Sequence, residues 1–430
     1  MKNEVFMENK RYKLGVIDLY SVAKNETEIE STPAFFVTLC DAVDRSRLSD
    51  ALREALSCYP LFATTLEYKG GYTLVSHNGE LPIIDSAIDE RPEYFGKESG
   101  GYLFRFCVYE REIAFEWSRI LTDEYCARDF LIAVLSAYFG EPIKAPDGEA
   151  ENILLEAFAE KSAASTATGA SAGEKPKENK KKDYSGVKNS HAPTRNNPDA
   201  ANLHTLRVGI SELRAASGRG DASLESVIIP IFSNVLHRRV GDGDGISVTA
   251  DVTFDCRSAD LNSMHNFSVS KILAYSGILG RTDVKRVMEL YEKMLSSARD
   301  SLKDEAEQTI RAVKPLVSIR PRILADIASL IVSKAVKGER SDFAFISLGE
   351  IKLPGKVKQA VADIKICAIP YSADAGISVL TLSDEVVITI TENYIDEKII
   401  SDFVSISKML GINFKLEKSK EFTQSRLKLK

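Results

Sequence analysis

The stretch that decides the fold is residues 114–124, which read AFEWSRILTDE. Its first residues are aromatic and apolar, which is typical of a strand that ends at the tryptophan. From Glu124 to Tyr138 apolar residues recur at the spacing of an amphipathic helix. Thr122 and Asp123 are residue types that cap helix N-termini. The sequence therefore predicts a strand, a short turn that carries Arg119, and a helix.

The same mixture of strands and helices extends outward from this stretch. Strands are predicted at residues 34–39, 63–66, 72–75, 102–109, 113–117, 206–210, 246–254, 343–346, 364–369, 377–382 and 386–391. Helices are predicted from Asp44 to about residue 58, and at 124–138, 224–236, 285–302, 304–312, 322–336 and 397–410. This succession favours an α+β protein in which each half is a mixed sheet with packed helices.

One segment, from about residue 160 to residue 201, has almost no apolar periodicity and is rich in Ala, Ser, Lys and Asn. Such a composition is typical of a flexible linker. The expected organisation is an N-terminal lobe at 1–158, a linker at 159–202 and a C-terminal lobe at 203–430.

Bulk composition narrows the classes of function. The 430 residues are 44% hydrophobic and 27% charged, and the formal net charge is -6. An acidic balance argues against a nucleic-acid partner, because phosphate binding needs a basic surface. The apolar runs are too short to span a bilayer, and the N-terminus has no signal-peptide pattern. Six cysteines without a C-x-x-C pair favour reduced core thiols and a cytoplasmic location.

The stretch at 114–124 resembles the central H-H-x-x-x-D-G motif of the coenzyme-A-dependent acyltransferase and peptide-synthetase condensation superfamily. Ser118 and Arg119 occupy the two histidine positions, Asp123 the aspartate and Glu124 the glycine. Further segments resemble motifs of its alcohol acetyltransferase branch in the same order: residues 11–12, 59–62, 251–257 with 266–267, 347–349 and 392–394.

The resemblance implies a chloramphenicol-acetyltransferase-like fold, in which two lobes face an interlobe channel. It also implies acyl transfer from a thioester to a hydroxyl or amine. The second histidine of the family is the general base, and the aspartate has a structural role. Coenzyme A or a phosphopantetheine arm would be the co-substrate, with no bound cofactor. A small-molecule acyl donor and acceptor, or a carrier protein, would be the partners.

Arg119 cannot perform the histidine's task, because a charged guanidinium has no lone pair to accept a proton. Ser118 has no activating base beside it in the sequence. We therefore expect acyl transfer to be weak or lost, which leaves open whether the protein is an enzyme. The alternative is a non-catalytic binding or scaffold protein on the same fold. For Arg119 itself, either a local ion pair with Asp123 or another carboxylate, or an anion site in the channel, is expected.

The remaining site candidates are few. His265 is a candidate substitute base, since its segment approaches the channel in the family. Trp117 is expected in the core, with channel lining as the alternative, and Glu124, Asn266 and Arg257 are candidate binding residues. Nothing near His204 marks it as functional. No histidines or cysteines have metal-ligand spacing, so no metal site is predicted.

Overall fold

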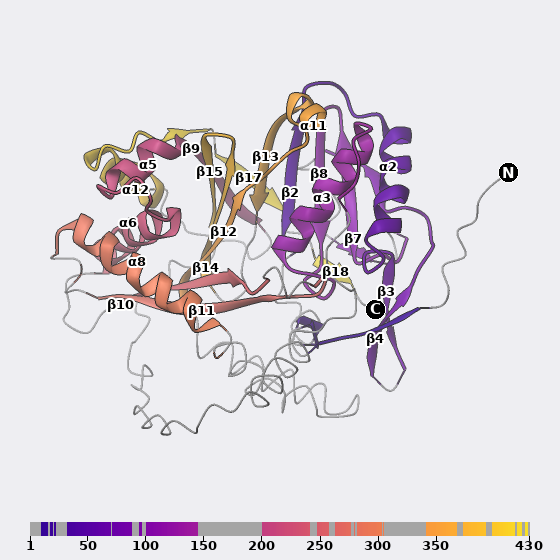
Figure 1. Cartoon of the computed structure of the whole chain (residues 1–430), viewed down its shortest axis with the longest axis horizontal. Coiled ribbons are helices and arrows are strands. Elements are labelled where there is room, and N and C mark those ends of the chain that lie inside the picture. Colours follow the sequence, from indigo (N-terminus) through magenta and orange to yellow (C-terminus); the bar gives the residue numbers. More distant parts are fainter. Residues whose placement is uncertain are drawn as a thin grey trace, which may run out of the picture.

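The protein is described here from a computed structural model, whose two halves lie side by side in Figure 1. The structure describes residues 10–15, 18–19, 21–22, 32–69, 71–87, 94–96, 100–144, 200–240, 247–257, 263–276, 279, 282–302, 304, 341–367, 373–392, 398–417, 419–423 and 426–428. The predicted linker, apart from its last three residues, and the predicted helix at 322–336 lie outside these ranges, as does nearly all of the predicted helix at 304–312.

The first half is a five-stranded sheet in the order β13-β2-β8-β7-β5. Its strands are β2 (Ala34–Leu39), β5 (Ile83–Asp85), β7 (Phe104–Tyr109), β8 (Glu112–Trp117) and β13 (Val361–Cys367). Helices α2 (Arg45–Cys58) and α3 (Glu124–Tyr138) share one hydrophobic core with it. In that core Phe130 of α3 stacks on Phe62 at 3.8 Å between ring centroids. Asp44 caps α2 by accepting a hydrogen bond from the Arg47 backbone N–H, as predicted.

The second half is a larger mixed sheet with main strand order β11-β10-β12-β14-β15-β9-β16, and β17 also pairs with β9. Its strands are β9 (Ala200–Gly209), β10 (Ser247–Asp255), β11 (Ser268–Ser276), β12 (Ser341–Glu350), β14 (Ala373–Leu382), β15 (Glu385–Glu392), β16 (Lys415–Leu416) and β17 (Lys420–Thr423). The helices of this half are α5 (Ile210–Ala216), α6 (Leu224–Val240), α8 (Val284–Asp300) and α12 (Lys398–Met409). Burial alternates along β10, as expected for a strand with one face on the core.

Smaller elements complete the chain. β1 (Arg11–Lys13) joins the hairpin of β3 (Thr64–Tyr68) and β4 (Tyr72–Ser76). β6 (Tyr94–Gly96) pairs with β18 (Arg426–Lys428), and α11 (Gly355–Ala360) precedes β13. The sequence patterns did not predict β1, β5, β6, β11, β16, β17, β18, α5 or α11. Most of these elements have six residues or fewer, which is too short for a periodic pattern to develop.

β13 comes from the second half of the sequence but belongs to the first sheet. It pairs antiparallel with β2, and Figure 1 shows it beside the N-terminal strands. Arg207 of β9 forms an ion pair with Asp363 of β13 at 2.5 Å, which ties the crossing strand to the second sheet. The two sheets also share a small apolar cluster of Ala34, Phe36, Cys107, Ala114, Leu203 and Cys367. The two halves are therefore in direct contact.

The six cysteines are all free thiols, but the expectation that all of them lie in the core is wrong for Cys40. Cys40 directly follows β2, where the chain leaves the sheet, and it is exposed, while Cys58 is partly buried. The other four are buried, and burial raises the pKa of Cys126 and of Cys256 to about 12.

These environments predict the order of thiol modification. At pH 8 iodoacetamide should alkylate Cys40 at least about 100-fold faster than Cys126, because only the thiolate reacts and burial suppresses it. Peptide mass spectrometry over a time course measures both rates. In denaturant the two rates should become similar. Equal rates in the native protein would show that the packing around α3 is not as described.

Among the residues the structure describes, no helix is both long and apolar enough to cross a membrane.

Candidate functional site

The predicted strand, turn and helix are all present, and the turn between β8 and α3 holds the candidate site. Ser118 stabilises this turn with both of its oxygens. Its carbonyl accepts from the Leu121 N–H at 2.9 Å, and its Oγ accepts from the Ile120 N–H at 3.2 Å. The residue is only 2% exposed. The role of Ser118 that follows from these contacts is to shape the turn that presents Arg119.

Arg119 forms a local ion pair, and the carboxylate is that of Glu124 rather than Asp123. Both Nε and Nη2 of Arg119 donate to Glu124 Oε1, at 2.9 and 2.7 Å. The side chains are 17% and 7% exposed. Glu124 is available because α3 begins there, which places its side chain next to the turn, whereas Asp123 is committed elsewhere.

Asp123 joins the two halves of the protein. Its Oδ1 accepts from the backbone N–H groups of Tyr125 and Cys126 at 3.2 and 3.1 Å, which caps α3. Its Oδ2 accepts from Arg257 Nη2 at 3.0 Å and from the Phe267 N–H at 2.7 Å. The Asp123 carboxylate thus accepts four hydrogen bonds, and its side chain is 2% exposed. Such a carboxylate positions the loop and has no lone pair left for a substrate.

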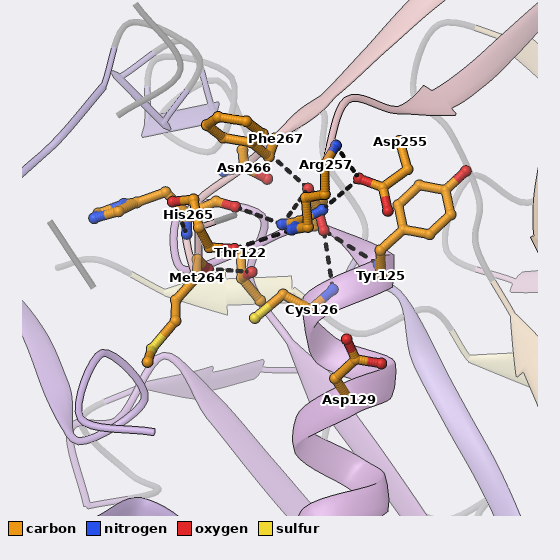
Figure 2. Close-up of polar contacts among 12 residues, drawn as sticks. Thr122, Tyr125, Cys126, Asp129, Asp255, Arg257, Met264, His265, Asn266 and Phe267 are labelled. Carbon is orange, nitrogen blue, oxygen red and sulfur yellow. Dashed lines mark hydrogen bonds and ion pairs between the residues drawn. The ribbon is translucent and has the colours of Figure 1, made fainter. Parts of the chain in front are cut away.

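Arg257 lies at the centre of this cluster, as Figure 2 shows. Beyond Asp123 it donates to Asp255 Oδ1 at 2.9 Å and to the carbonyls of Ser263 and His265 at 3.0 and 2.8 Å. Burial alone would lower the pKa of Arg257, but Asp123 and Asp255 raise it well above its ordinary value. Arg257 therefore stays charged and binds protein groups, so its geometry favours a structural role over the predicted substrate binding.

Burial has the opposite effect on Asp255. Loss of solvent raises the pKa of this carboxyl above its ordinary value, although Arg257 partly offsets the effect.

Asn266 and His265 follow in the same segment. Asn266 Nδ2 donates to the Arg119 carbonyl and to Asp18 Oδ1, both at 2.6 Å. His265 is 1% exposed, and its Nδ1 lies 3.2 Å from Asp18 Oδ2. Within the described part of the chain neither ring nitrogen has a partner in hydrogen-bond geometry. In Figure 2 His265 and Asp255 lie on opposite sides of Arg257.

Asp18 is the member of this site that sequence reasoning missed. It accepts the Gly15 N–H at 2.8 Å and the Asn266 side chain, and it is 1% exposed. Its segment has no periodic pattern, and the Asn266 contact joins residues 248 positions apart. No local signal in the sequence could have predicted it.

Trp117 is fully buried and stacks between Phe35 and Phe115, with ring centroids 5.3 Å from each. It therefore packs in the core of the first half. Among the described residues, no three or more His, Cys, Asp or Glu side chains are grouped so that they could hold a metal ion.

Comparison with known proteins gives a clear result for the fold alone. No family model matches the chain, and no curated protein matches it in sequence. The solved structures do match. Polyketide synthase associated protein 5 from Mycobacterium tuberculosis has a TM-score of 0.60 at 14% identity, over 93% of this chain and 98% of that one.

Two further structures have the same architecture. F. sporotrichioides TRI101, solved with coenzyme A and T-2, has a TM-score of 0.60 at 10% identity over 94% of this chain and 99% of its own. The condensation domain of the Monacolin K polyketide synthase MokA has a TM-score of 0.59 at 10% identity over 94% and 97%. The chain therefore has the chloramphenicol-acetyltransferase-like fold of condensation domains and coenzyme-A-dependent acyltransferases, as its motifs predicted.

Proposed function

We propose that this protein is an acyltransferase-fold protein that binds a thioester, of coenzyme A or of a carrier protein, and transfers its acyl group weakly or not at all. The observation that carries the proposal is the pairing of Arg119 with Glu124 at the position where the family motif has its histidine. A paired guanidinium cannot accept a proton from a hydroxyl or amine. Loss of a general base typically lowers a rate by about 100- to 10,000-fold.

The contacts of Asp123 around the turn support thioester binding over a function unrelated to that of the family. Asp123 still caps α3 and still joins the two halves through Arg257 and Phe267. Two solved structures of similar fold support a thioester as the ligand: one contains coenzyme A, and another contains C8-CoA and Leu-SNAC. Acceptance of a thioester, small or carrier-bound, is the proposed extension to this chain. The free thiols are consistent with the proposed cytoplasmic location.

A non-catalytic binding or scaffold role is the second candidate, and the same Arg119–Glu124 pair favours it. The two candidates differ in thioester binding, which the first requires and a scaffold does not.

A thiol-release assay with acetyl-coenzyme A and simple alcohols or amines tests the proposal. We expect turnover that is undetectable, or too slow to change by more than about twofold in Arg119→Ala. Acetyl-coenzyme A should nevertheless raise the unfolding temperature in a concentration-dependent way, because a ligand that binds only the folded state stabilises it. Absence of any such shift would contradict thioester binding.

Fast wild-type turnover that survives Arg119→Ala would contradict the lost-base argument. It would point to another base, and His265 beside Asp18 would be the first residue to replace, as His265→Gln.

A further inference from the structure

A second group of polar side chains lies on the larger sheet of the second half. It is at the N-terminal end of β9, where β15 pairs with one edge of this strand and β17 with the other. His204 of β9 lies opposite Ile390 of β15, and Asn202 lies opposite Glu392. On the other side of β9, Lys420 pairs with Leu203, so Ser419 arrives next to His204. These residues come from β9, from β15 and from the position directly before β17, and they are not part of the turn that holds Arg119.

Ser419, His204 and Glu392 form a continuous hydrogen-bonded chain. Ser419 Oγ lies 2.7 Å from His204 Nδ1, and His204 Nε2 lies 2.9 Å from Glu392 Oε1. A carboxylate can only accept, so Nε2 must carry the hydrogen that joins it to Glu392. In the neutral ring Nδ1 then holds the lone pair, and the Ser419 hydroxyl donates to it. This polarity is what a serine nucleophile needs from its base.

Burial differs within the group: the base and its carboxylate are buried, and the serine residue is exposed. The side chains of His204 and Glu392 are 6% and 2% exposed. Asn202 Nδ2 also donates to Glu392 Oε1, at 3.2 Å, which fixes the carboxylate. Ser419, in contrast, is exposed to solvent. A buried, oriented imidazole therefore contacts the hydroxyl of an exposed serine.

We propose that Ser419 is an activated nucleophile that accepts acyl groups from small oxygen esters, with His204 as its base and Glu392 as the residue that orients the imidazole. In the first step the bond between Ser419 Oγ and the acyl carbon forms, and the bond from that carbon to the leaving oxygen breaks. The Ser419 proton passes to His204 Nδ1 and then to the leaving group. In a second step water attacks the acyl carbon while His204 Nδ1 takes a proton from it, the bond from that carbon to Ser419 Oγ breaks, and His204 returns the proton to Oγ.

The test uses the full chain and a fluorophosphonate probe, which forms a bond from Ser419 Oγ to phosphorus as fluoride leaves. Peptide mass spectrometry should locate the adduct at Ser419. We expect His204→Gln, which keeps a polar side chain but removes the base, to lower the labelling rate by about 100-fold or more. The rate of 4-nitrophenyl acetate hydrolysis should also fall in His204→Gln, and it should fall in Ser419→Ala, which lacks the nucleophile.

Ser405 is the matched control. It is also an exposed serine of the second half, but its Oγ donates to the Ser401 carbonyl at 2.7 Å and has no imidazole in that bond. Ser405 should remain unlabelled, and Ser405→Ala should label at Ser419 as fast as the wild type. Labelling of Ser405 and Ser419 at equal rates, or of neither, would overturn the proposal and leave His204 as an anchor for the strand.

A second variant keeps the proposal testable if His204→Gln does not fold. In Ser419→Cys the imidazole should favour the thiolate, so iodoacetamide at pH 7 should alkylate position 419 at least about tenfold faster than the exposed Cys40 of the same molecule. Alkylation slower than at Cys40 would count against the activated site. Both experiments test the Ser419 site and involve neither Arg119 nor a thioester. A negative result here therefore does not contradict the proposed function, and a negative result there does not contradict this proposal.

Discussion

Thiol release from acetyl-coenzyme A by the double variant Arg119→His/Glu124→Gly is expected to exceed the wild-type rate by about 100-fold. A positioned general base contributes on the order of 100- to 10,000-fold. The lower end applies here because Ser118 also departs from the family motif. Two substitutions are needed because Glu124 lies within hydrogen-bond distance of the Arg119 side chain.

The single variant Arg119→His should gain far less. An introduced imidazole beside the Glu124 carboxylate would be stabilised in its charged form, which raises its pKa above the ordinary value near 6.5. The charged ring has no lone pair and cannot act as a base at neutral pH. As the pH is raised through this elevated pKa, the single variant should gain activity.

The matched control is Arg119→Gln/Glu124→Gly, which makes the same room without supplying a base. Initial rates with saturating acetyl-coenzyme A, measured for all three variants between pH 6 and 9, separate the effects. A rate gain in the glutamine control equal to that of the histidine variant would show that space, and not proton transfer, limits the wild-type protein.

Asp123→Ala is expected to lower the free energy of unfolding by about 3–5 kcal/mol. The substitution leaves Arg257 buried without the carboxylate that joins it to α3, and losing one partner of a buried ion pair costs about that much. It also removes the cap of α3 and the acceptor of the Phe267 N–H. The bonds from Asp123 to Arg257 and Phe267 hold the two halves together, so both halves should unfold at a lower denaturant concentration.

Asp129→Ala is the control, because it removes the same functional group from within α3, the helix that Asp123 caps. Asp129 forms an ion pair with Arg128, and its side chain is 48% exposed. Exposed ion pairs contribute about 0–1 kcal/mol. Urea unfolding followed by circular dichroism compares the two variants with the wild type. Equal stabilities of Asp123→Ala and Asp129→Ala would contradict the joining role of Asp123.

The sequence alone determined the local structure around the site. The pattern from residue 114 to Tyr138 predicted β8, the turn and α3, and the aspartate at 123 was identified as a helix cap and a structural residue. It also determined which base is missing, since the identity of Arg119 excludes proton acceptance whatever the fold around it. The regular order of strands and helices, with the motifs, was sufficient for the fold class.

Pairing over long distances was decided only by the tertiary structure. Asp123 contacts Arg257, 134 residues away, and Arg119 pairs with Glu124 because Asp123 is already occupied. The sequence did not distinguish these two carboxylates, which are adjacent in the chain. Asp18, the position of β13 in the first sheet, and the chain of Ser419, His204 and Glu392 likewise depend on contacts between distant strands. Periodicity reports which face of an element is buried, but the partner on that face is fixed only when whole elements pack together.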